Sequence, residues 1–243
     1  MNSILKTQNT SAAAGQKKDN NTVDPESGSS DDGHRNNQDK AAETEAFSGL
    51  CLVLVAIFFI CGAYFLQRGT RTNLKYPFAF FLAGSVFYIV QGCLELCTKF
   101  HDKVERVIPI ITVIAGEFWF IASIFLLPNL FYLGAFTNSF VIWSSLWLAG
   151  SALNIISITF NFAMLIIRSK FTTKPILLVS SLCLSWFANI LFLTGCAIFI
   201  KIHDQGGTLV EYDSFCKLLV AASVMFLLHA VCYTWHYLSV DKH

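Results

Sequence analysis

Long apolar runs separated by short charged segments dominate the chain from residue 47 onward. A helix needs about 20 apolar residues to cross the core of a bilayer, and several stretches between the charged segments reach that length. The expected spans are 47–67, 76–97, 108–128, 140–167, 175–200 and 216–238. The sequence therefore predicts six transmembrane helices in a membrane domain at 47–240.

Turn residues divide the longest apolar run. Residues 118–167 form a stretch of 50 residues without a charge, which is too long for one pass. Pro128, Asn129 and the segment 134–139 supply the turn that splits it. Three spans are expected to begin with a proline near the first helical position, where the missing N–H does no harm: Pro77, Pro109 and Pro175.

The first 46 residues have a different character. Asn, Ser, Asp, Lys, Gln and Gly dominate them, and they carry five Lys/Arg against eight Asp/Glu. Such a segment buries too little apolar area to offset its ordering entropy, so residues 1–46 are predicted to be a disordered polar tail. No apolar stretch follows a basic start, so we expect no cleaved secretory signal.

Composition supports an integral membrane protein. Hydrophobic residues make up 54% of the 243 residues and charged residues only 14%, too few to cover a soluble body. The ten-residue alternation of transmembrane strands is absent, so the fold class is all-α. No basic cluster reaches the density that binding to nucleic acid requires. The lipid bilayer is the expected environment, and the partners left open are other membrane proteins and further copies of the chain.

Basic residues near the ends of the spans predict the orientation. On the side of the tail they number nine: Arg35, Lys40, Lys99, Lys103, Arg106, Arg168, Lys170, Lys174 and Lys242. On the opposite side they number five: Arg68, Arg71, Lys75, Lys201 and Lys217. The positive-inside rule therefore predicts that both termini face the cytoplasm, although the first loop alone argues the other way. The sequence does not identify the membrane.

A short element recurs in the even-numbered spans. The tripeptide Ala83-Gly84-Ser85 returns as Ala149-Gly150-Ser151 and again as Ala221-Ala222-Ser223. Weaker similarities in the odd-numbered spans have offsets close to the same period. A fixed period predicts three copies of a two-helix hairpin. Chance likeness between apolar helices is the alternative.

The repeat places polar residues on one face of each even-numbered span. Residues at i, i+4, i+7 and i+11 share a helix face, and small residues on it let helix backbones approach. In the second span this face carries Gly84, Tyr88, Gln91 and Glu95. The corresponding residues are Gly150, Asn154, Ser157 and Asn161, and then Ala222, Phe226, His229 and Tyr233. We expect these faces to point into the bundle.

The hairpin pattern also resembles a known family. The stretches FFLAGSVF (80–87) and LWLAGS (146–151) combine small residues with apolar runs, as does the YrhK-like domain, a short membrane hairpin that occurs singly or in several copies. The resemblance would cover residues 47–238. It implies a membrane hairpin fold, and it transfers no chemistry and no site residues.

Glu117 is the charge deepest inside a predicted span. A charged acid at mid-bilayer costs about 2.5–3.5 kcal/mol on insertion scales. We therefore predict that Glu117 points inward toward Gln91, Asn154, Ser157 or His229, and we favour a pair with His229. The candidate intramembrane polar site comprises Glu117, His229, Gln91, Glu95, Asn154, Ser157 and Asn161. A packing role for the acid is the alternative.

No catalytic, cofactor or metal site is predicted. His229 and His236 are seven residues apart on one helix, about 10.5 Å along its axis, and cannot share a metal ion. The cysteines lie in or beside spans, and we expect them to be free thiols. Ser151 with His229 superficially resembles the intramembrane serine proteases of the rhomboid type, but position 149 is Ala where that family expects Gly. We expect no enzymatic activity.

Two functions follow from these features. The first, and the one that we expect, is a structural or accessory membrane component that assembles through small-residue faces. The second is a small-solute, ion or proton transporter or channel that uses the polar stripe, in line with the internal repeats of many transporters. A continuous wet cavity among spans two, four and six would favour the second, and a tightly packed centre would favour the first.

Overall fold

The computed structural model describes residues 30–68, 75–97, 103–125, 139–168, 175–205 and 209–240. It separates residues 1–37 from residues 38–243, and of the first unit only the start of one helix, from residue 30, is described. The predicted disorder of residues 1–29 and the predicted turn at Pro128-Asn129 lie outside the described residues.

Every described segment is an α-helix. Helices α1 (Ser30–Arg68), α2 (Lys75–Cys97), α3 (Lys103–Phe125), α5 (Ser139–Arg168), α6 (Pro175–Gln205) and α7 (Leu209–Val240) follow one another along the chain. All six are long and apolar enough to cross a membrane. Their membrane-competent segments are Glu43–Arg68, Tyr76–Cys97, Arg106–Phe125, Val141–Ile167, Ile176–Ile202 and Glu211–Ser239. These segments confirm the six predicted spans and the all-α membrane fold.

Several helices extend beyond the predicted spans. Helix α1 begins at Ser30, inside the predicted tail. Residues 39–46 (DKAAETEA) are mostly good helix formers and favour extension of the apolar helix into the tail. Helix α3 begins at Lys103, so Pro109 lies inside the helix, and the prediction that it opens this span is wrong. Residues 103–108, which include charged side chains, extend the helix in the N-terminal direction beyond the apolar stretch. Helix α7 begins before residue 216, and its first turns hold an ion pair between Lys217 Nζ and Asp213 Oδ2 at 2.6 Å.

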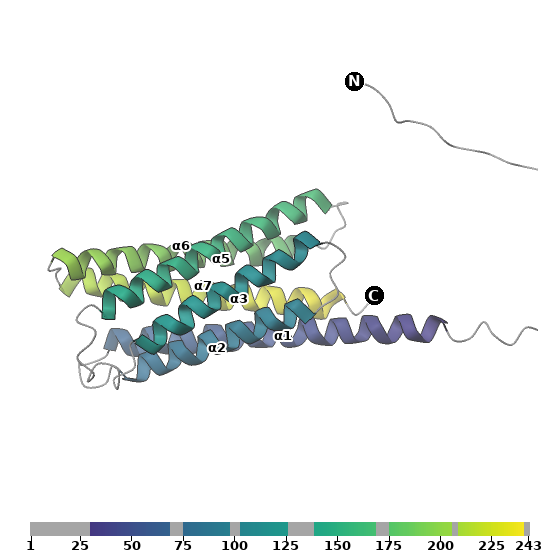
Figure 1. Ribbon diagram of the computed structural model, residues 1–243, viewed down its shortest axis with the longest axis horizontal. Helices are drawn as coiled ribbons and strands as arrows, with labels where there is room; N and C mark the ends of the chain where they lie inside the picture. Colours follow the sequence, from purple (N-terminus) through teal and green to yellow (C-terminus); the bar gives the residue numbers. More distant parts are fainter. Residues whose placement is uncertain are drawn as a thin grey trace, which may run out of the picture. The chain divides into compact units, whose positions relative to one another are not determined.

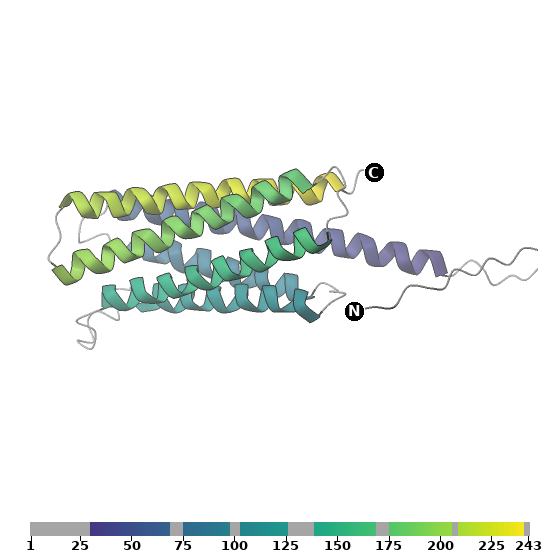
Figure 2. The same ribbon diagram turned by 90° about the horizontal axis from the view of Figure 1, so that it is seen from above.

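In the unit of residues 38–243, the helices run up and down and surround a common centre (Figures 1 and 2). Helix α2 packs on α3, α3 on α5, α5 on α6 and α6 on α7. Helix α1 closes the ring. A Cβ added at Gly62 would lie 2.9 Å from Phe81 of α2, and one added at Gly49 would lie 2.5 Å from Thr234 of α7.

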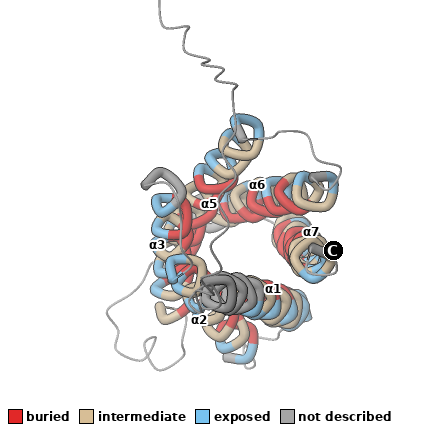
Figure 3. The backbone as a smooth tube through the Cα atoms, turned by 90° about the vertical axis from the view of Figure 1, so that its right-hand side faces the viewer, coloured by how far each residue is buried: buried red, intermediate tan, exposed pale blue. Residues whose placement is uncertain are grey.

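Buried residues lie on the inward sides of the helices (Figure 3). Gly84, Gly150 and Ala222, the small residues of the recurring tripeptide, are all buried. A Cβ added at Gly84 would lie 2.5 Å from Phe59, and one added at Gly150 would lie 2.6 Å from Trp119. The close helix approach expected at these glycines is therefore present. The repeat itself stays a prediction.

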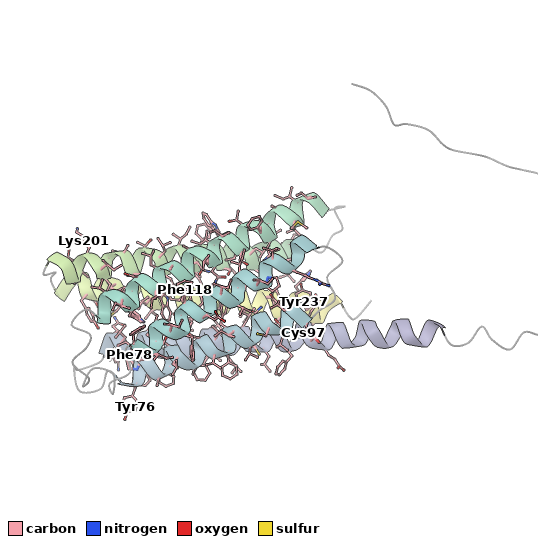
Figure 4. All side chains as sticks on the ribbon, viewed as in Figure 1. Tyr76, Phe78, Cys97, Phe118, Lys201 and Tyr237 are labelled. Carbon is pink, nitrogen blue, oxygen red and sulfur yellow. The ribbon has the colours of Figure 1, made fainter. Side chains whose placement is uncertain are left out.

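The two ends of the bundle are named here by a residue at each (Figure 4). Cys97 and Tyr237 lie at one end, called the Cys97 end, where α2 and α7 finish. Tyr76, Phe78 and Lys201 lie at the other, called the Tyr76 end.

Aromatic side chains fill the core from the middle of the bundle toward the Tyr76 end. Phe59 of α1 has ring contacts with one aromatic residue from each of the other helices, at centroid distances from 5.4 to 6.3 Å. The aromatic cluster comprises Phe59, Phe81, Trp119, Trp143, Trp147, Phe192, Phe215 and Phe226, all 1% exposed or less. Aromatic pairs in such contacts contribute about 0.5–1.5 kcal/mol each beyond area burial. The centre is therefore closed over this half of the bundle.

Candidate functional site

A cavity of about 60 Å³ lies between the aromatic cluster and the Cys97 end. All six helices contribute to its lining, which is mostly polar: Leu52, Tyr88, Gln91, Glu95, Thr112, Asn154, Ser157, Ile158, Asn161, Leu182, Ser185, His229 and Tyr233. One water needs roughly 10–15 Å³ of such volume. The cavity therefore has room for about four to six waters, or for a solute of a few heavy atoms.

The structure brings together most of the sequence-predicted site. Gln91, Glu95, Asn154, Ser157, Asn161 and His229 all line the cavity. They come from α2, α5 and α7, the helices whose polar faces were expected to point inward. Close approach of neighbouring helices helps these faces to reach one cavity, because Gly150 lets α5 approach α3 and Gly84 lets α2 approach α1.

Glu117 is the exception, and its predicted inward orientation is a correction. Its side chain is exposed on the outer face of α3, on a stripe with Ile114 and Ile121. Its neighbour Gly116 faces α2, where an added Cβ would lie 2.9 Å from Ile89. One residue further along a helix is a rotation of about 100°, so the packing of Gly116 directs Glu117 outward. The expected pair with His229 does not form.

A hydrogen-bonded chain crosses the bundle at the inner wall of the cavity. The Tyr88 hydroxyl donates to Asn154 Oδ1 at 2.5 Å, and Asn154 Nδ2 donates to Asn189 Oδ1 at 3.2 Å. Asn189 Nδ2 then donates to the Ser185 carbonyl at 2.8 Å. These bonds join α2, α5 and α6. Asn189 is fully buried and was missed from the sequence. The sequence does contain a signal for Asn189: it lies four residues after Ser185 in an uncharged span, so the two polar side chains share a helix face.

Glu95 is the acid of the lining. Gln91 Nε2 and the Tyr233 hydroxyl both donate to Glu95 Oε1, the latter at 3.2 Å. Gln91 itself is only 3% exposed, and its Oε1 has no hydrogen-bond partner among the described residues. A buried amide oxygen without a partner is uncommon, because it loses its hydrogen bond to water. This residue of the lining therefore carries a buried acceptor that no described residue satisfies.

Thr112 and Ser157 form a smaller contact between α3 and α5. Their hydroxyl oxygens are 3.1 Å apart, and both hydroxyls lie within bonding distance of the Ile108 carbonyl, at 3.2 and 3.3 Å. This group ties the two helices together at the cavity wall.

His229 is held by Ser181 of α6. Its Nδ1 lies 3.0 Å from the Ser181 carbonyl and 2.8 Å from Ser181 Oγ, and Oγ lies 3.4 Å from the His229 carbonyl. A proton on Nδ1 satisfies all three contacts. Nδ1–H then donates to the Ser181 carbonyl and to Oγ, and the Ser181 hydroxyl donates to the His229 carbonyl. In this tautomer Nε2 carries the lone pair and is an acceptor.

The Ser181–His229 pair does not resemble an accessible catalytic dyad. Ser181 is fully buried and does not belong to the lining of the cavity, so a solute there would not reach its hydroxyl. Ser151, the serine considered from the sequence, is also fully buried away from the cavity. Within the described residues, no group of three or more His, Cys, Asp or Glu side chains is arranged to hold a metal ion. All eight cysteines are free.

Asn154→Ala should destabilise the bundle more than Asn161→Ala. Both amides line the cavity, but only Asn154 bonds Tyr88 and Asn189, so its loss leaves buried groups on two other helices unpaired. The expected difference in unfolding free energy is about 1–3 kcal/mol. Thermal melts of the two purified variants in one detergent measure this difference. Equal melting temperatures would contradict a structural role for the hydrogen bonds of Asn154.

Comparisons of the chain with models of protein families, with curated proteins and with solved structures gave no match.

Proposed function

We propose that this multi-pass membrane protein is a carrier for a small polar solute and that the cavity is its binding site. The observation behind the proposal is a polar cavity inside the bundle, lined by all six membrane-competent helices. Polar side chains inside a membrane bundle are costly, and they commonly mark a path for a solute. A volume of about 60 Å³ with such a lining holds water or a small solute.

The aromatic cluster supports a carrier rather than an open channel. Phe59 contacts rings from every other helix, so it closes the centre between the cavity and the Tyr76 end. Hydrophobic constrictions of this kind gate by excluding water. The indole N–H groups of Trp143 and Trp147 are buried without hydrogen-bond partners among the described residues. An opening that hydrates them would recover those bonds.

The three-hairpin organisation is part of this proposal. Transporters often move internal repeats against each other around a central site. The recurring tripeptide and the resemblance to the YrhK-like hairpin support hairpins α1–α2, α3–α5 and α6–α7 as the repeated units. Superposition of the three pairs in an experimental structure tests this. If the three helix pairs do not superpose, the proposal of a repeated hairpin is wrong.

The accessory role is the second candidate, and the packed aromatic half of the bundle favours it. Solute flux separates the two. Liposomes containing the purified protein should take up at least one of three labelled solutes, urea, glycerol or methylammonium, faster than empty liposomes do. Ser157→Leu fills the cavity and should abolish the difference. Thr159→Leu introduces the same side chain on the exposed face of α5 and should not. Equal uptake of each of the three solutes in all samples would support the accessory role.

The orientation is also proposed. The excess of basic residues on the side of the tail supports cytoplasmic termini. Protease added to sealed vesicles of known orientation should cut residues 1–29 only from the cytosolic face. Glycan attached at Asn9 or Asn20, the two sequons of this segment, would contradict it.

A further inference from the structure

We propose that the solute held in the cavity is a small monovalent cation of the ammonium class. This inference rests on the proposed function, since it names the ligand of that same site. It follows from which polar atoms of the lining are already bonded and which are not.

Several donors of the lining are occupied within the protein. The hydroxyls of Tyr88 and Tyr233 donate to Asn154 and Glu95, and the amides of Gln91 and Asn154 donate to Glu95 and Asn189. Each hydroxyl would have to break its bond to donate to a ligand, whereas each amide keeps a second N–H. The two tyrosine hydroxyls are therefore not free to bind an anion.

Acceptors, in contrast, remain available. Gln91 belongs to the lining, and its buried Oε1 has no partner among the described residues. His229 also lines the cavity, and the contacts of its Nδ1 with Ser181 leave Nε2 as an acceptor. A ligand that donates several hydrogen bonds complements these two atoms.

Charge points the same way. Glu95 belongs to the lining, and the described lining residues include neither Lys nor Arg. Glu95 is half-buried near the end of α2. A carboxylate partly removed from water favours a positive ligand, because a charge out of water needs an opposite charge beside it. The rings of Tyr88 and Tyr233 offer further faces to a cation.

Size and coordination select the ammonium class. Room for about four to six waters admits ammonium or methylammonium but excludes bulky quaternary ions. Ammonium donates up to four hydrogen bonds of about 2.8–3.0 Å to separated acceptors. A transition-metal ion would instead need clustered His, Cys or carboxylate ligands, and the described residues contain no such group.

Binding is tested on the purified full-length protein in nanodiscs. Ammonium chloride and methylammonium chloride should raise the melting temperature in a saturable way, whereas sodium chloride, tetraethylammonium chloride and urea at equal concentration should not. Glu95→Gln should weaken ammonium binding at least tenfold. Gln91→Leu keeps the carboxyl group but removes the Gln91 acceptor and the bond from Gln91 Nε2 to Glu95. It should weaken binding in the same way, so it tests the site if Glu95→Gln does not fold. Glu117→Gln is the matched control, an acid of the same bundle outside the cavity, and should bind normally.

The outcomes separate this inference from the carrier proposal. Urea or glycerol flux that is sensitive to Ser157→Leu, without ammonium binding, would overturn the cation inference and keep the carrier. Ammonium binding without any flux would keep the site and overturn the carrier. Equal stabilisation by sodium and ammonium, or unchanged binding in both Glu95→Gln and Gln91→Leu, would overturn the inference.

Discussion

Gly150→Ala is expected to destabilise the bundle strongly, although alanine is the better helix former. An added Cβ would lie 2.6 Å from Trp119 Cδ1 and 2.9 Å from the Ala115 carbonyl oxygen. The carbonyl is backbone and the indole is held by a 3.2 Å bond from its Nε1 to the Trp147 carbonyl, so neither has room to move. Overpacking of this kind costs about 1–3 kcal/mol, and Gly150→Leu should cost more.

Gly195→Ala is the matched control. Gly195 is also a buried helical glycine, but an added Cβ there would meet Phe215 at 3.6 Å, an ordinary contact. This variant should be neutral or gain up to about 1 kcal/mol from helix propensity. Thermal melts in one detergent compare the two. Equal stability of the two variants would contradict the close approach of α3 and α5 at Gly150.

Phe59→Ala should have the largest effect on the aromatic cluster. It removes a fully buried ring that contacts one ring from each of the other helices, so it leaves a void at the centre. Large-to-small changes of this type cost about 3–5 kcal/mol. If the cluster is the closed gate, the void also joins the cavity to the Tyr76 end. Liposomes containing this variant should then leak ammonium faster than wild type.

Two further variants make the Phe59 result interpretable. Phe187→Ala removes a ring that is 52% exposed on α6 and should leave stability and leak unchanged. Phe59→Leu keeps most of the volume, so it should fold where Phe59→Ala does not and should show an intermediate leak. A folded Phe59→Ala protein without added leak would show that the cluster supports packing alone.

The predicted ion pair at mid-bilayer failed for a reason that applies to other membrane bundles. Glu117 was placed inward because an exposed carboxyl in lipid is costly. That argument considers the acid alone, whereas the packing of the adjacent Gly116 against Ile89 determines the rotation of α3. Many close contacts along a helix outweigh the preference of one side chain.

The sequence alone determined the number and positions of the helices. Uncharged runs of bilayer length are a property of the chain, and each backbone polar group in lipid has to be bonded within its own helix. The polar faces of α2, α5 and α7 were also readable, because positions three and four residues apart share a helix face. Six of the seven predicted site residues therefore lie in one cavity: Gln91, Glu95, Asn154, Ser157, Asn161 and His229.

Only the tertiary structure decided how these faces meet. It set the rotation of α3 and joined His229 to Ser181. It also brought Asn189 into the hydrogen-bonded chain and placed Phe59 against all the other helices. Helix periodicity shows which residues share a face of one helix. It does not show which face of another helix packs against them, or how the two helices are shifted along their axes. Those choices depend on how large and small side chains from separate helices fit together, and this fit exists only once the bundle has formed.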